Sequence, residues 1–262
     1  MSADQIRFND GATYERYMGT WSQLVGDRFL DWLAPPPRQH WLDVGCGNGA
    51  FTEMIFSRCD PASVNGVDPS EQQLTFARAR PTLQDARFRQ GDAMALPYPD
   101  DGFGVAVMPL VIFFVPDPAA GVAEMARVVR AGGIVTAYAW DMPGGGFPYE
   151  ALLAEMRRLG ITVPAPPSPD ASRVEVMLDL WGRAGLDELE TCMIEVHRSY
   201  ADFDDFWTTA CGAPSVGAAL RTMEDGLVAR LKARMRDRLP LQRDGRITYG
   251  ARANAVKGRV PI

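Results

Sequence analysis

The sequence predicts an α/β fold: a seven-stranded, mostly parallel sheet with helices on both faces, plus a helical lid inserted between the last two strands. Two observations predict it. Strand-like apolar runs alternate five times with helix-like segments over residues 40–140, which is typical of a parallel sheet. Two long alternating segments, 186–200 and 245–258, enclose helix-like stretches, and the second of them is expected to be an antiparallel strand.

Apolar periodicity and its interruptions predict the elements in order. The prolines of APPP end the first helix, Ser70 caps the helix after the second strand, and Gly132-Gly133 close the helix before the fifth strand. The nearly all-apolar fourth strand is typical of a strand covered on both faces. Helices are expected at 12–33, 49–57, 70–80, 119–133, 149–159, 173–184, 202–210 and 217–238, and strands at 40–44, 63–68, 86–92, 103–110, 134–140, 186–200 and 245–258.

Composition disfavours several classes of function. The net charge of −6 and the pI of about 5.1 argue against nucleic acid or an anionic membrane as the main partner. The basic residues at alternate positions from 230 to 238 are interpreted as a solvated helix face. The four cysteines lack metal-site spacing, so we expect reduced thiols, no metal and a cytoplasmic location. The N-terminus lacks an apolar signal core, and no apolar run is long enough to span a bilayer.

The stretch WLDVGCGNGAF, residues 41–51, carries the main functional signal. Gly45, Gly47 and Ala50 satisfy the dinucleotide pattern G-x-G-x-x-A, with Asp68 about 20 residues further on. Asp43 at the lip of the turn argues against that ligand, because a carboxylate about 4 Å from a phosphate costs about 4 kcal/mol at an effective dielectric near 20. S-adenosylmethionine, which has a cationic ammonium and a sulfonium where the dinucleotide has phosphates, suits a carboxylate there.

Polar or turn residues follow four of the expected strands. Gly45, Asp68, Asp92 and Leu110 all fall at carboxyl ends. Ligands of open parallel sheets bind in the crevice at those ends, so we expect these residues to converge on one site.

Four stretches in this order resemble the motifs of class I S-adenosylmethionine-dependent methyltransferases: LDVGCGNGAF, VNGVDPSEQQL, RQGDAMALPYPDDGFGVAV and AEMARVVRAGG. Within that class the sequence is most similar to the ubiquinone/menaquinone-biosynthesis-like, or type 11, group. The resemblance covers residues 38–140 and implies a Rossmann-like sheet. The sequence as a whole divides into three parts of one domain: an N-terminal helical entry segment (1–37), a cofactor-binding core (38–140), and a substrate-side half (141–262), where the residue pattern and not the resemblance predicts a flap (141–172) and a helical lid (202–240).

The resemblance also implies a set of site residues. Gly45 and Gly47 let the backbone approach the methionine tail, and Asp43 acts on its amino group directly or through water. Asp68 accepts hydrogen bonds from both ribose hydroxyls. The other residues implied to contact the cofactor are Pro69 and Leu74 beside the adenine, Asp92 and the Ala93 N–H at the adenine edge, Leu110 near the sulfonium, and Tyr17, Met18 and Trp21 closing over it.

Each of the three aspartates has a structural alternative. Asp43 is a candidate to pair with Arg16 or Arg38, Asp68 to cap the helix near Ser70, and Asp92 to bond its own turn. Trp21 and Tyr17 are equally well read as packing residues. The sequence departs from the family pattern at Met108-Pro109, where many relatives have polar residues.

The acceptor and any general base are less well defined. An acidic chain with aromatic residues in the expected lid indicates a small, partly apolar acceptor. His197 on the late strand is the histidine that remains a weak candidate base, because His40 precedes the first strand. A methyltransferase is the leading hypothesis, with an NAD-type oxidoreductase and a non-enzymatic cofactor-binding regulatory protein as alternatives. A homodimer is one of the oligomeric states left open.

Overall fold

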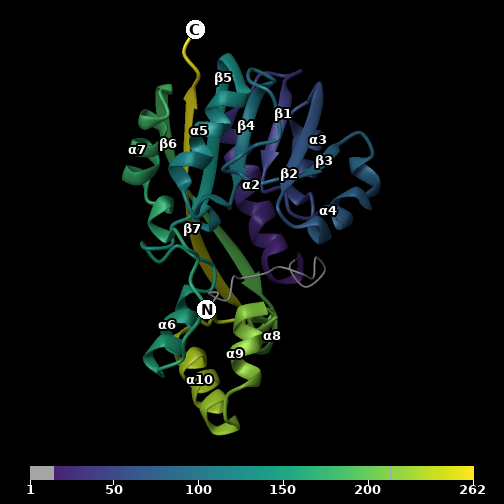
Figure 1. Cartoon of the computed structure of the whole chain (residues 1–262). Helices are drawn as coiled ribbons and strands as arrows, with labels where there is room; N and C mark the ends of the chain where they lie inside the picture. The colour runs from purple at the N-terminus through teal and green to yellow at the C-terminus, as the bar shows by residue number, and fades with distance from the viewer. Residues whose placement is uncertain (1–14, 213) are drawn as a thin grey trace.

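The computed structural model describes residues 15–212 and 214–262 and contains one seven-stranded sheet, in the order β3-β2-β1-β4-β5-β7-β6 (Figure 1). Strand β7 runs antiparallel to both of its neighbours, and β1 to β5 pair in parallel. The strands are β1 (His40–Val44), β2 (Ser63–Asp68), β3 (Arg87–Gln90), β4 (Phe103–Pro109), β5 (Val129–Trp140), β6 (Asp187–Tyr200) and β7 (Ile247–Arg259). The expected mostly parallel sheet of seven strands is confirmed.

Helices cover both faces of the sheet. Helices α2 and α3 pack together on one face, and α5 and α7 pack together on the opposite face (Figure 1). Helix α3 connects β1 to β2 and α5 connects β4 to β5, and because these right-handed crossovers run in opposite directions along the sheet, the two helices lie on opposite faces. All residues of β4 are buried, as expected for a strand between two helical layers. The helices are α2 (Thr20–Leu33), α3 (Ala50–Arg58), α4 (Glu71–Arg78), α5 (Pro118–Val128), α6 (Glu150–Arg158), α7 (Val174–Arg183), α8 (Phe203–Cys211), α9 (Pro214–Arg221) and α10 (Asp225–Arg238), with short turns η1 (Glu15–Gly19), η2 (Pro81–Leu83), η3 (Ile112–Phe114) and η4 (Pro169–Ser172).

The expected helical ending at Gly132-Gly133 is wrong. Helix α5 ends at Val128, and the next residue, Val129, already pairs with Phe103 of β4. The Gly132 N–H donates to the Val260 carbonyl at 2.8 Å instead of closing the helix. Pairing with a neighbouring strand and with the C-terminal segment therefore overrides the local helix-ending signal. The helix expected from residue 12 begins as η1 and continues as α2, and its first residues lie outside the described part.

The helical lid lies beyond the carboxyl ends of the parallel strands (Figure 1). Strand β5 ends at Trp140, which pairs with Ala253, but β6 and β7 stay paired as far as Tyr200 and Ile247. This two-stranded extension carries α8, α9 and α10, so the lid has three helices where the sequence predicted two.

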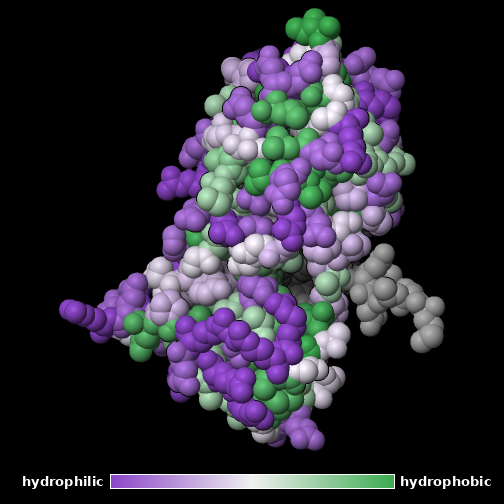
Figure 2. Space-filling model, turned by 90° about the vertical axis from the view of Figure 1, so that its left-hand side faces the viewer, coloured by the Kyte–Doolittle hydropathy of each residue, from purple (hydrophilic) through white to green (hydrophobic). Residues whose placement is uncertain are grey.

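Two rows of cations on α10 connect the lid to its neighbours. Arg234 and Arg238 contact Glu155 of α6 at 3.4 and 2.5 Å, and Lys232 and Arg236 contact Asp204 of α8 at 2.9 and 3.6 Å. Hydrophilic side chains gather on the part of the surface where α6 and α10 lie (Figure 2). The basic residues of α10, which the sequence predicted to form a solvated face, therefore also make ion pairs that link α10 to α6 and α8.

Within the described ranges, no helix is both long and apolar enough to cross a bilayer.

Candidate functional site

The glycine turn after β1 is held against the neighbouring strand. The N–H groups of Gly45 and Cys46 both donate to the Val67 carbonyl of β2, at 2.8 and 3.1 Å. Gly45, Gly47 and Gly49 have φ values of +74°, +52° and +82°, a region that residues with a Cβ rarely adopt. All three positions therefore require glycine for backbone reasons alone.

The three glycines face different surroundings. A Cβ at Gly45 would lie 2.6 Å from the Val111 side chain, and one at Gly49 would lie 2.6 Å from Leu83. A Cβ at Gly47 would meet no atom within 4 Å. Gly47 is thus the glycine of this turn with open space beside it, where a ligand can approach the backbone.

Asp43 is fully buried directly beneath the turn. Its Oδ2 accepts a hydrogen bond from Thr52 Oγ1 at 2.7 Å, and its Oδ1 has no hydrogen-bond partner. Burial raises the pKa of this carboxyl to about 7; the Thr52 hydrogen bond opposes the shift, and the negative Asp68 adds to it. No ion pair joins Asp43 to an arginine among the described residues; the Arg16 side chain lies outside them.

Asp68 connects the carboxyl end of β2 to the turn. Its Oδ2 accepts the Gly47 N–H at 2.9 Å, and its Oδ1 accepts the Ser70 N–H at 2.8 Å. Burial raises the pKa of Asp68, and these two hydrogen bonds oppose the shift. The Ser70 hydroxyl caps helix α4 by accepting the Gln73 N–H. Ser70 therefore provides the side-chain cap that the structural alternative assigned to Asp68.

The residues predicted to surround the adenine differ in exposure. Pro69 is exposed, Ala93 is half-buried, and Leu74 is fully buried in the core. Asp92 is exposed, and its Oδ1 accepts the Met94 N–H at 2.9 Å. The turn that the alternative reading proposed for Asp92 therefore exists, and contact with a ligand stays a prediction.

Leu110 follows β4 in a left-handed conformation, with φ of +60°. Its N–H donates to the Tyr138 carbonyl at 2.7 Å, which holds the chain end of β4 beside β5. The next residue, Val111, covers Gly45. The loop after β4 is thereby brought onto the glycine turn, as the predicted site requires.

Trp21 is fully buried, and its indole N–H donates to the Tyr200 hydroxyl at 3.2 Å. It also packs edge-on against Trp140, with ring centroids 6.5 Å apart. Tyr17 and Met18 are buried too, and Tyr17 stacks on Tyr149 at 4.3 Å. These residues pack η1 and α2 against the substrate-side half, as the structural alternative for Trp21 and Tyr17 predicted. Their contact with a cofactor stays a prediction.

Neither histidine lies in the convergent region. His197 is exposed on β6 beside Gly250, on the face opposite Tyr200 because side chains alternate along a strand. His40 begins β1, at the opposite end from the turn, and its ring contacts Ser63 Oγ at 2.8 Å.

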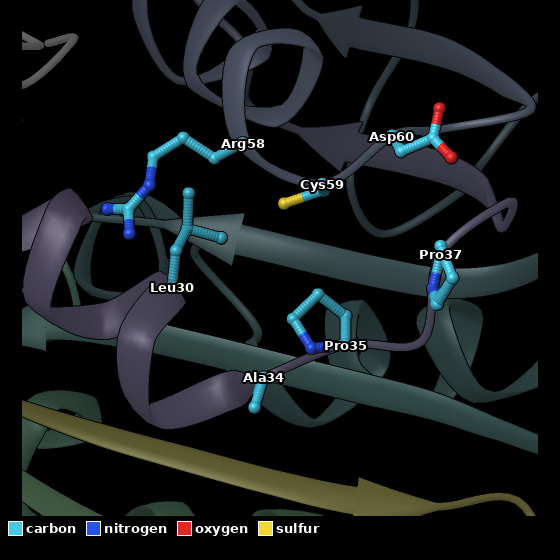
Figure 3. Close-up of a pocket in the computed structure, with 7 residues that line it drawn as sticks. All are labelled: Leu30, Ala34, Pro35, Pro37, Arg58, Cys59 and Asp60. Carbon is cyan, nitrogen blue, oxygen red and sulfur yellow. The ribbon is translucent and has the colours of Figure 1, made fainter.

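A cavity of about 250 Å³ lies at the amino end of the sheet, away from the glycine turn (Figure 3). The Cys59 sulfur is turned toward Leu30 there, and burial raises the pKa of its thiol to about 11. The cavity is lined by Leu30, Ala34, Pro35, Pro37, Arg58, Cys59 and Asp60. None of the predicted site residues belongs to it.

Sequence reasoning missed Thr52 and Val111 in the region of the turn. Thr52 lies one turn into α3 and reaches back to Asp43. Val111 reaches Gly45 from a loop more than 60 residues later. A hydroxyl residue soon after the glycine turn was a readable signal for Thr52; the Val111 contact depends on the tertiary fold and has no local signal.

Residues 42–137 match the sequence profile of a methyltransferase-domain family. A chloroplastic 2-methyl-6-phytyl-1,4-hydroquinone methyltransferase 2 of rice is 41% identical over 93 residues, which is 36% of this chain and 27% of that protein. A ubiquinone/menaquinone biosynthesis C-methyltransferase of Dinoroseobacter shibae is 37% identical over 111 residues, 41% of this chain and 44% of that protein. The chain thus spans under half the length of these relatives.

Among solved structures, a phosphoethanolamine N-methyltransferase 2 of Haemonchus contortus in complex with S-adenosylmethionine has a TM-score of 0.60 at 17% identity, over 96% of this chain and 56% of that one. That likeness concerns the fold. Residues 42–137 are therefore similar in sequence to methyltransferase domains, and the chain shares the Rossmann-like fold of that methyltransferase, in agreement with the sequence motifs.

Proposed function

We propose that this protein is an S-adenosylmethionine-dependent methyltransferase that acts on a small, partly apolar acceptor. The observation that carries the proposal is the negative lining of the glycine turn. Asp43 has a buried oxygen without a partner, and Asp68 lies on the Gly47 N–H. A cationic ammonium group gains from the Asp68 carboxylate and favours the ionised form of Asp43, whereas a pyrophosphate would be repelled by Asp68 and would favour the protonated form of Asp43.

The described residues fit this cofactor. Open space at Gly47 leaves room for the methionine tail against the backbone, and the unpartnered Asp43 oxygen can take a hydrogen bond from its amino group directly or through water. Each Asp68 oxygen accepts one N–H and keeps lone pairs for the ribose hydroxyls. We keep Pro69, Asp92 and Ala93 as the proposed adenine contacts, with Leu110 proposed near the sulfonium and Trp21 over the cofactor.

When bound, the cofactor supplies a methyl group that is already activated by its sulfonium. The chain's own task is then to align the acceptor with that methyl group and to exclude water. We assign no general base, since His197 is exposed on the far face of β6. An acceptor whose nucleophilic atom is deprotonated or carries a free lone pair at neutral pH needs none.

The proposed acceptor is defined by its chemical class. A hydroquinone, the substrate named for the rice relative, belongs to the proposed class of small, partly apolar molecules. The family match ends at residue 137, however, and the lid with its two-stranded extension lies after it. Four free cysteines support a cytoplasmic location as part of the proposal.

Calorimetry with S-adenosylhomocysteine tests the cofactor. We expect binding by the wild-type protein, and its loss in Asp68→Ala, because the ribose hydroxyls and the Gly47 N–H then both lose their acceptor. Asp85→Ala, which removes an exposed carboxylate at 85 outside the site, is the matched control and should bind as wild type. Binding of NADH in place of S-adenosylhomocysteine, or unchanged binding in Asp68→Ala, would contradict the proposal. Transfer of a labelled methyl group to an acceptor panel then tests catalysis.

A further inference from the structure

Arg198 is a half-buried arginine, and one nitrogen of its guanidinium is enclosed by the protein without a hydrogen-bond partner. It lies on β6 two residues before Tyr200, so both side chains point to the α2 face of the sheet. Its guanidinium carbon lies 4.8 Å from the centre of the Tyr200 ring. One of its terminal nitrogens, Nη1, is buried and has no hydrogen-bond partner, and no ion pair joins Arg198 to an acid in the described ranges.

The surroundings of Arg198 are aromatic and come from several elements. Phe206 of α8 packs edge-on against Tyr200 at 5.2 Å, and Tyr249 of β7 is the strand partner of Arg198. Tyr149, which precedes α6, packs against Phe206 with ring centroids 6.3 Å apart. The lid, the extension and the segment before α6 therefore meet in the aromatic cluster around Tyr200, the ring that the Arg198 guanidinium contacts.

A further buried donor in this region also lacks a partner. The Trp140 indole nitrogen has none, although its ring packs against Trp21. Arginine and tryptophan can only donate hydrogen bonds, so what this region lacks is an acceptor.

A buried cationic donor without an acceptor is costly, since the group has lost water and gained nothing in return. The two acids at the start of α8 do not relieve it: Asp202 accepts the Asp205 N–H at 2.9 Å, and Asp205 accepts the Ala201 N–H at 2.9 Å. A ligand that brings an anionic oxygen would satisfy the guanidinium, and hydrogen bonds between two charged groups are the stronger kind.

We propose that Arg198 binds an anionic group of the methyl acceptor, and that the acceptor is an apolar or aromatic carboxylate. This inference rests on the proposed function. Two strands, β5 and β7, separate β6 from β4, where Leu110 marks the expected methyl position. Three strand spacings amount to about 14 Å across the sheet, and the register places Arg198 six residues, or about 20 Å, further along the strands than the level of Pro109, the residue before Leu110. The carboxylate is therefore a recognition group at the opposite end of the acceptor from the atom that is methylated.

Calorimetry with matched ligand pairs tests the proposal. The probes are octanoate, cinnamate and 4-hydroxybenzoate, each paired with its neutral carboxamide, titrated with and without saturating S-adenosylhomocysteine. We expect the wild-type protein to bind at least one carboxylate about tenfold or more tightly than its carboxamide. Arg198→Met should weaken binding of that carboxylate about tenfold or more and leave carboxamide binding unchanged. Arg198→Lys should retain part of the preference for the carboxylate, because lysine keeps the positive charge but lacks the paired N–H donors of the guanidinium.

Two controls separate recognition from folding. Arg243→Met removes an exposed arginine and should bind every probe as wild type. Arg198→Met should melt, without ligand, at the wild-type temperature or above it, because it removes a buried donor that has no partner. A lowered melting temperature with equal loss of both ligands of a pair would show a structural role and overturn the proposal.

The proposal is also overturned if the wild-type protein prefers no carboxylate, or if Arg198→Met keeps the preference. Failure of S-adenosylhomocysteine to bind any variant would instead remove the proposed function, and the titrations without it would still decide whether Arg198 holds an anion.

Discussion

Gly45 and Gly47 share the same backbone requirement for glycine but differ in what surrounds them. Both have positive φ, which costs a residue with a Cβ about 1–2 kcal/mol. At Gly45 a Cβ would in addition overlap Val111, whereas at Gly47 it would enter open space. A side chain at Gly45 would therefore disturb the packing of the protein, whereas a side chain at Gly47 would occupy the space open to a ligand.

We expect Gly47→Ala to lower the free energy of unfolding by about 1–2 kcal/mol, the backbone cost alone. It should also weaken S-adenosylhomocysteine binding, because the new methyl group occupies the ligand's side of the turn. Gly45→Ala should destabilise the protein more, since Val111 must also move. Denaturant unfolding and calorimetry on both variants check this; a larger stability loss in Gly47→Ala would show that the two surroundings have been assigned the wrong way round.

The buried Asp43 should make stability depend on pH. The folded protein holds its proton up to about pH 7, while the usual pKa of this group is 3.8. Between these values the folded state binds more protons than the unfolded state, so the free energy of unfolding of the ligand-free protein should fall as pH rises and then level off above about pH 7.

Asp43→Asn should lack this part of the pH dependence. Its stability relative to wild type is expected to increase from pH 4 to pH 7 and then remain constant, as measured by urea unfolding in a pH series. Asp85→Asn, an exposed change of the same kind, should run parallel to wild type. Parallel curves for Asp43→Asn as well would mean that the carboxyl is ionised in the fold.

At the scale of elements, α10 acts as a connector between α6 and α8. The Glu155 side chain is only 7% exposed and receives three arginines, from α6 and α10. Burial opposes its ionisation, but the hydrogen bonds from Arg238 and Arg158 outweigh it and hold the pKa of Glu155 below its usual range. Its stabilising effect is therefore present above the usual glutamate pKa and is lost as pH falls through the lower value in the fold.

Glu155→Gln should loosen the lid, because three guanidinium groups lose their shared carboxylate. We expect faster amide hydrogen exchange in α10 and unchanged exchange in β1 and β4, with a lower melting temperature. Glu224→Gln, an exposed residue at the start of α10, is the control and should exchange as wild type. Uniform acceleration across the sheet would instead mean that lid and core unfold as one unit.

For the whole molecule, ligand binding should appear as stabilisation by mass action. S-adenosylhomocysteine at 100 times its dissociation constant should raise the free energy of unfolding by about 2.7 kcal/mol, because it binds the folded state alone. NADH at the same concentration should leave the melting temperature unchanged, since its pyrophosphate meets Asp43 and Asp68. Thermal unfolding with both ligands checks this, and stabilisation by NADH alone would favour the dinucleotide interpretation.

The sequence alone determined what depends on local pattern. Alternating apolar runs predicted the seven strands, and the spacing of Asp43, Gly45, Gly47 and Asp68 predicted a turn and two carboxylates at adjacent strand ends. These predictions succeed because strand and turn propensities act over a few residues, and because carboxyl ends of parallel strands must meet at one edge.

Contacts between distant segments were decided only by the tertiary structure. Strand pairing with the C-terminal segment converted the expected helix end at Gly132 into β5, and the same long-range pairing extended β6 and β7 past the core. The unpartnered oxygen of Asp43 and the unpartnered nitrogen of Arg198 likewise have no local signal. Whether a buried polar group finds a partner depends on which chain segments close around it, and that is a property of packing.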